Sequence, residues 1–204
     1  SYYTREWNEE FYPGYGSSWG MYHGAVGILY EQAGTDGSVV RQPDGSYLTY
    51  LDAVAHQFTS SMANLDTAAR HRDALLRDYL AGRRAAVDAG RRGPVRAFAW
   101  AGSDSARAAH LADILMAQGV EVYRSGGPLT LVEAHDYWGG SHARKRLPAG
   151  SWVVPLDQPL EPLVRNVLEF HVAMPDSFLR EERDWLERDK GTRLYEVTAW
   201  SLPI

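Results

Sequence analysis

The chain has 204 residues, a net charge of −5 and no cysteine, and 45% of its residues are hydrophobic. This length and apolar content suit one sizeable domain, or a modest domain with an appendage, around a packed core. The missing cysteine excludes disulfides and thiolate zinc sites, the acidic charge argues against nucleic acid as a partner, and no apolar run approaches the ~20 residues that span a bilayer, so we expect no membrane contact.

The first 34 residues predict an irregular aromatic loop followed by one strand. Residues 11–19 are rich in glycine, proline and aromatic side chains, and the short apolar strand after them ends at Glu31. A carboxylate at the end of a buried strand is costly unless it faces a polar cleft or has a partner. Turn residues between positions 33 and 45 then indicate a hairpin or a surface loop.

From Leu51 onward the hydrophobic pattern takes the period of a helix. The apolar residues on one stripe are Leu51, Ala55, Phe58, Met62, Leu65, Ala69, Leu76, Tyr79 and Leu80. No helix breaker stands between residues 49 and 82, and residues 83–89 extend the pattern. We therefore expect a continuous helix of about 50 Å that links two bodies. It should end at residues 91–94, Arg-Arg-Gly-Pro.

Beyond residue 93 short apolar strands alternate with helices. Strands are expected at 95–101, 120–123, 152–156 and 195–200, and helices at 104–118 and 160–168. The first strand, helix and strand of this series imply parallel strands joined by a right-handed crossover. The whole series predicts an α/β fold, a flavodoxin-like three-layer sandwich with a mainly parallel sheet.

A family resemblance rests first on the block from Tyr12-Pro13-Gly14-Tyr15-Gly16 to Tyr30-Glu31-Gln32. This block resembles the last part of the catalytic domain of zinc carboxypeptidases, the carboxypeptidase A-like metallopeptidases, in their large bacterial branch. The resemblance implies that Glu31 is the general base that activates a zinc-bound water. It also implies that a tyrosine, Tyr12 or Tyr15, closes over the C-terminal end of a peptide substrate.

The resemblance extends to the second half of the chain. Members of that branch carry a domain similar to class I glutamine amidotransferases after the peptidase domain. Residues 149–155, 158–159 and 197–203 resemble recurring features of that domain. Amidotransferases need a nucleophilic cysteine, so this domain is expected to be inert as an amidotransferase.

The zinc ligands of that family, His-x-x-Glu and a distant His, precede the strand that ends on the base. This chain contains no His-x-x-Glu. We therefore expect it to be the C-terminal portion of a larger protein, which would hold zinc, while the chain itself has no cofactor and is inactive alone. The expected parts are a peptidase tail at 1–50, a linking helix at 51–92 and an amidotransferase-like domain at 93–204. The family favours a secreted or periplasmic parent.

Other residues have plainer explanations beside the chemical ones. His110 and Asp113 are one helical turn apart and could form half of a metal site with His135 or His142, but an exposed helix face explains the pair as well. Ser103 suits a helix N-cap better than a nucleophile. The arginines between residues 70 and 96 are interrupted by aspartates, which is typical of a solvated helix face.

Two alternative functions belong to different classes. The chain could be a non-catalytic α/β module that binds or scaffolds a partner, or a stand-alone hydrolase with its own metal site around His110, Asp113 and His135. Apolar side chains left open on a partial peptidase domain, Val26, Ile28 and Leu29 in particular, would favour association into a homodimer.

Overall fold

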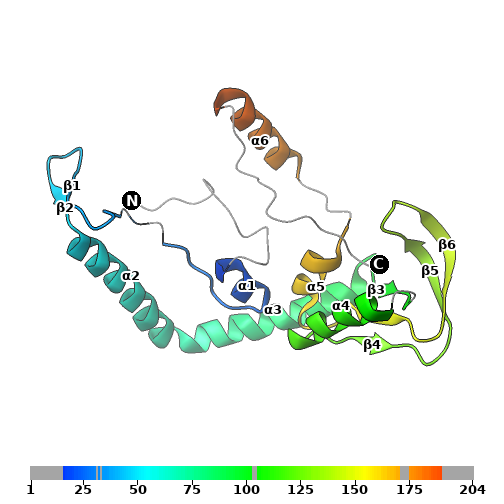
Figure 1. The fold of residues 1–204 in the computed structure, drawn as a ribbon. Helices are drawn as coiled ribbons and strands as arrows, with labels where there is room; N and C mark the ends of the chain where they lie inside the picture. The colour runs from blue at the N-terminus through cyan, green and yellow to red at the C-terminus, as the bar shows by residue number, and fades with distance from the viewer. Residues whose placement is uncertain (1–15, 31, 33, 103–104, 171–174, 190–204) are drawn as a thin grey trace.

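The computed structural model describes residues 16–30, 32, 34–102, 105–170 and 175–189 (Figure 1). Its helices are α1 (Gly16–Tyr22), α2 (Tyr50–Arg70), α3 (Arg72–Arg92), α4 (Ser105–Ala117), α5 (Glu161–Leu168) and α6 (Asp176–Asp189). Its strands are β1 (Val40–Arg41), β2 (Tyr47–Leu48), β3 (Ala97–Trp100), β4 (Tyr123–Arg124), β5 (Leu129–His135), β6 (Ser141–Leu147) and β7 (Trp152–Pro155). The chain therefore mixes helices with small sheets, an α/β fold in the general sense.

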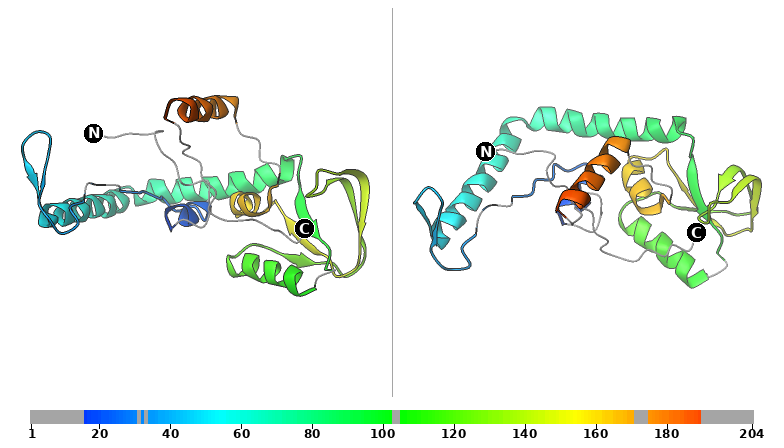
Figure 2. Two further views of the ribbon diagram at one scale, coloured as in Figure 1. Left: turned by 45° about the horizontal axis from the view of Figure 1, so that its top comes forward. Right: turned by 90° about the horizontal axis from the view of Figure 1, so that it is seen from above.

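The long helix expected after residue 49 is two helices that meet at a bend (Figures 1 and 2). Helix α2 begins with a capping box, in which the Thr49 side chain accepts from the Asp52 N–H at 3.2 Å and the Asp52 carboxylate accepts from the Thr49 N–H at 2.9 Å. His71 ends it, because its backbone (φ −106°, ψ 14°) leaves the helical region. The prediction of one continuous helix was wrong at this residue, and its predicted end at Arg92 is confirmed.

Three strands form the central sheet in the order β3-β7-β4, and both outer strands pair antiparallel with β7. Strands β3 and β4, which precede and follow α4 in the sequence, consequently run in the same direction. They are not paired with each other, because β7 lies between them. The remaining described sheets, β1-β2 and β5-β6, are antiparallel hairpins. The expectation of a mainly parallel, flavodoxin-like sheet was therefore wrong for the described residues, since a strand from later in the chain inserts into the crossover unit.

Several local predictions are confirmed. Strands β3 and β7 and helices α4 and α5 fall within the ranges expected for them, and the turn residues after position 33 form the β1-β2 hairpin. The strand expected before Glu31 is absent from the described residues, where 25–30 have no regular secondary structure. The sequence analysis did not anticipate the β5-β6 hairpin or α6, and the strand expected at 195–200 lies outside the described residues.

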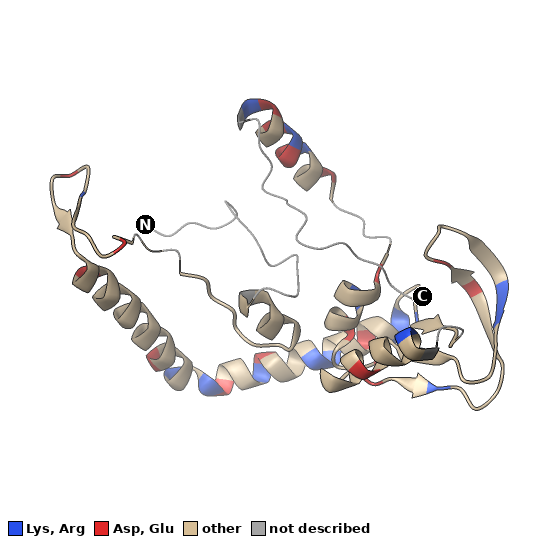
Figure 3. Ribbon diagram, viewed as in Figure 1, with Lys and Arg blue, Asp and Glu red and all other residues tan. Residues whose placement is uncertain are grey.

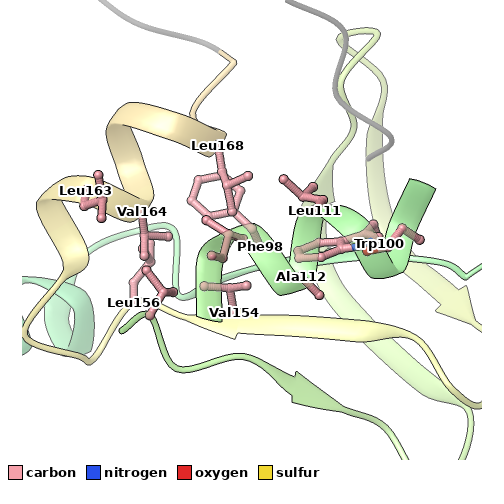
Figure 4. Close-up of a cluster of buried hydrophobic side chains, with 12 residues drawn as sticks. Phe98, Trp100, Leu111, Ala112, Val154, Leu156, Leu163, Val164 and Leu168 are labelled. Carbon is pink, nitrogen blue, oxygen red and sulfur yellow. The ribbon is translucent and has the colours of Figure 1, made fainter. Parts of the chain in front are cut away.

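The hydrophobic core lies between the central sheet, α4 and α5, which together are called the α/β body below. Figure 4 shows side chains of α4 and α5 converging on Phe98 of β3 and Val154 of β7. Trp100 is 2% exposed, and its indole N–H donates to the carbonyl oxygen of Ala108 in α4 at 3.3 Å. The members of the core are Phe98, Trp100, Ala108, Leu111, Ala112, Leu115, Val120, Val154, Leu156, Leu163, Val164 and Leu168.

A buried glutamine joins the end of β7 to the chain before β4. Gln158 is 1% exposed, and its amide nitrogen donates to the carbonyl oxygens of Pro155 at 2.6 Å and Glu121 at 3.2 Å. Its amide oxygen accepts from the N–H of Glu121 at 2.8 Å. A buried polar group with several partners contributes to stability rather than costing it, so Gln158 fixes the loop that follows β7.

Helix α3 approaches this loop at Gly90 more closely than any side chain would allow. A Cβ placed on Gly90 would lie 1.9 Å from the carbonyl oxygen of Leu156 and 2.6 Å from the nitrogen of Asp157. Both of these are backbone atoms, which cannot rotate away as a side chain can. Only glycine permits this contact.

We predict opposite outcomes for two glycine substitutions in α3. Gly90→Ala should destabilise the protein by about 3 kcal/mol or more, because the clash is with backbone. Gly82→Ala, which meets nothing within 4 Å, should stabilise it by about 1 kcal/mol through helix propensity. Urea unfolding followed by tryptophan fluorescence measures both, and a Gly90→Ala variant as stable as the wild type would contradict the close contact at Gly90.

Candidate functional site

All three site residues expected from the sequence, Glu31, Tyr12 and Tyr15, lie outside the described residues. Only their neighbours in the sequence are described. Tyr30 and Gln32 flank Glu31, and α1 begins at Gly16, directly after Tyr15. The described chain between α1 and α2 can therefore be followed up to both sides of position 31.

Helix α2 holds both neighbours of Glu31. The Tyr30 hydroxyl donates to the side-chain oxygen of Asn64 at 2.8 Å, and the Gln32 amide donates to the hydroxyl of Ser60 at 2.7 Å. Ser60 and Asn64 are one helical turn apart, so they lie on one face of α2. This pair of hydrogen bonds is the first anchor of the segment.

A second anchor lies at the end of α1, against the α/β body. The Asn166 amide of α5 donates to the Tyr22 hydroxyl oxygen at 2.6 Å. One guanidinium nitrogen of Arg83, on α3, donates to the carbonyl oxygens of Pro159 at 2.8 Å and Tyr22 at 3.4 Å. The rings of Trp19 and Tyr22 pack against the hydrophobic core. Helix α1 is therefore attached to the body by both apolar and polar contacts.

The chain leaves this second anchor through His23 and Gly24. The two ring nitrogens of His23 lie 3.1 Å from the Trp19 carbonyl oxygen and 3.3 Å from that of Gln118, at the end of α4. Gly24 has φ +88°, and a Cβ there would lie 2.7 Å from the ring of Tyr79. A left-handed backbone in a confined space calls for glycine, so Gly24 sets the direction in which residues 25–30 leave α1.

The two faces of α2 are used in an unusual way. None of the described side chains of α2 is buried, and the apolar stripe stays open, with Leu51 75%, Phe58 66% and Leu65 64% exposed. Ser60 and Asn64, which hold Tyr30 and Gln32, lie on the side away from this stripe. Figure 3 shows few charges along most of α2, in contrast to the mixed charges of α3. The polar face of α2 thus contacts Tyr30 and Gln32, whereas no part of the described chain covers its apolar face.

The tip of the β5-β6 hairpin holds an aspartate and two histidines. The Asp136 carboxylate accepts from the N–H groups of Gly140 at 2.8 Å and Trp138 at 3.1 Å, and it lies 2.8 Å from His142 Nε2. The pKa of Asp136 is held below its ordinary value, mainly by the hydrogen bond with His142 and next by that from Gly140. Ser141 contacts His135 instead, at 3.0 Å, so no single histidine links a serine to a carboxylate here.

The structure does not assemble the alternative metal site. His110 and Asp113 are exposed on α4, while His135 points to Ser141 in the hairpin. Within the described ranges no three His, Cys, Asp or Glu side chains gather as metal ligands would. Likewise, none of the helices searched among the described residues combines the length and apolar character needed to cross a membrane.

Comparisons of the chain with protein-family models, with curated proteins and with solved structures find no match. The anchoring residues could not be expected from the sequence. They are Ser60 and Asn64 at the first anchor and Tyr22, Arg83 and Asn166 at the second. No local pattern could have revealed Tyr22 with Asn166, because 144 positions separate them.

We predict that acid destabilises the tip of the β5-β6 hairpin, because it protonates Asp136. In the folded protein the pKa of Asp136 lies below its ordinary value of 3.8. The ionised carboxylate therefore stabilises the hairpin at pH values above 3.8, and this contribution is lost as the pH falls through the folded-state pKa. His142→Ala should move the pKa of Asp136 back up. A carboxyl ¹³C NMR titration measures this, with Trp138→Phe as the control that keeps every backbone donor. An unchanged pKa in His142→Ala would contradict the assigned cause.

Proposed function

We propose that the chain is the C-terminal part of a zinc-dependent carboxypeptidase-like metallopeptidase, with Glu31 as its general base. The observation that carries the proposal is the sequence block of residues 11–32, in which a glycine- and tyrosine-rich loop leads to Tyr-Glu-Gln. The substrate class would be peptides, or peptide-like amides, cut at their C-terminal end. The described residues do not form a zinc site, so the ligands of the proposed enzyme would lie outside them.

In the proposed reaction each residue of this chain has a limited task. Bound zinc would supply a water of lowered pKa, as it does in other zinc hydrolases. Glu31 would accept the proton of that water, which requires its carboxylate to lie within hydrogen-bond reach of the water oxygen. Tyr12 or Tyr15 would donate a phenolic hydrogen bond to the substrate carboxylate or to the developing oxyanion.

Hydrogen bonds on both sides of position 31 support a role that depends on position. Both of its neighbours, Tyr30 and Gln32, are hydrogen-bonded to α2. A general base contributes most when it is held in a reactive geometry before the substrate arrives. The hydrogen bonds of Tyr30 and Gln32 to one face of α2 are consistent with such a role for Glu31.

A second candidate, a binding or scaffolding module, is favoured by the β5-β6 hairpin. The hairpin projects from the α/β body (Figure 1), and Trp138 at its tip is 88% exposed. Strand β6 carries Arg144, Lys145 and Arg146 in sequence. This module would bind an acidic or aromatic partner without turnover, and it is compatible with a peptidase parent.

The proposal is tested in the longer protein that it implies. We expect its gene to encode His-x-x-Glu ahead of this segment and its purified form to release C-terminal residues from peptides. Glu31→Gln should lower kcat about 10²–10⁴-fold with zinc content unchanged, because it removes the proton acceptor alone. Glu187→Gln, on the exposed surface of α6, is the matched control and should keep full activity.

Two results would contradict the proposal. One is a gene without His-x-x-Glu before this segment, and the other is full activity in Glu31→Gln. The isolated 204-residue chain adds a check by elemental analysis after dialysis. One tightly bound zinc that is lost in His110→Ala would favour the stand-alone hydrolase instead.

A further inference from the structure

We propose that the α/β body holds the segment that leads to Glu31 in its working position, with Tyr22, Asn166 and Arg83 as positioning residues. The inference rests on the function proposed above, because it gives the contacts of α1 a catalytic consequence. It assigns a task to the second half of the chain, which has no cysteine nucleophile and which the proposed reaction does not otherwise use.

The first step is the contact between Tyr22 and Asn166. Their hydrogen bond, at 2.6 Å, joins the last residue of α1 to α5 in the α/β body. Tyr22 also packs against the hydrophobic core, so its ring and its hydroxyl are held by the same body. A movement of α5 would therefore move the end of α1.

The second step is Arg83, which connects three elements at one point. It extends from α3 and donates both to the carbonyl oxygen of Tyr22, at the end of α1, and to that of Pro159, in the loop before α5. Its guanidinium also lies over the Tyr79 ring, 5.6 Å from the centroid. Hydrogen bonds from a charged donor are stronger than those between neutral groups, so Arg83 resists separation of α1 from the body.

The third step is the segment of residues 25–30, which links the end of α1 to the contacts on α2. After Gly24, residues 25–30 have no regular secondary structure, and the next fixed points are Tyr30 and Gln32 on α2. The segment is thus stretched between two anchors, and neither anchor alone defines its path. Loss of the α1 anchor would leave residues 25–30 held by α2 only. In the proposed reaction, a displacement of about 1 Å in a reacting group can cost about 10²-fold in rate.

A double-mutant cycle in the zinc-loaded longer protein tests the inference. Tyr22→Phe removes the hydroxyl and keeps the ring, while Asn166→Ala removes the donor. Each should lower kcat about fivefold, as expected for one hydrogen bond, and the double variant should lower it little further because both remove the same contact. The KM and the zinc content should not change. Tyr123→Phe is the control, since its hydroxyl bonds to Glu121 on the surface of the same body.

A second readout does not depend on activity. In the 204-residue chain, Tyr22→Phe should speed amide hydrogen exchange in residues 19–30 and leave α4 and β7 unchanged. Unchanged exchange would contradict the claim that the Tyr22–Asn166 hydrogen bond holds the segment. Faster exchange with an unchanged kcat would overturn its role in positioning the base. An inactive wild-type protein would instead contradict the proposed function, and the exchange rates would still decide whether the body holds the segment.

Discussion

At Gly90 the backbone of α3 touches the backbone at the end of β7, where a side chain would collide with the Leu156 carbonyl oxygen. This contact sets both the depth and the rotation of α3 on the α/β body. Arg83 lies seven residues earlier, two helical turns away, and so faces the same side. It meets Tyr22 and Pro159 there. The attachment of α1 is therefore a consequence of how closely α3 packs.

From this packing the arrangement of the candidate site follows in order. Helix α3 fixes the end of α1, Gly24 turns the chain away beside Tyr79, and α2 receives Tyr30 and Gln32 on its polar face. The α/β body and the two helices thus act as a frame for the irregular segment of residues 25–30.

Elements that depend on near neighbours could be predicted from the sequence, whereas contacts between distant parts of the chain could not. Helices α4 and α5 and strands β3 and β7 could be predicted because their hydrophobic periods depend on near neighbours. The insertion of β7 between β3 and β4 could not, since a period shows which face is buried and not which strand lies beside it. His71 is no helix breaker by type, so the bend had no signal. At the site, Glu31, Tyr12 and Tyr15 remain predictions from a resemblance.

The most direct test is a crystal structure, with zinc bound, of the longer protein that the proposed function implies. The account predicts that the Glu31 carboxylate lies within about 3 Å of a zinc-bound water. It also predicts that the hydrogen bonds of Tyr22 to Asn166 and of Tyr30 to Asn64 are kept in that structure. A metal site remote from Glu31, or a protein without a zinc site, would contradict the account.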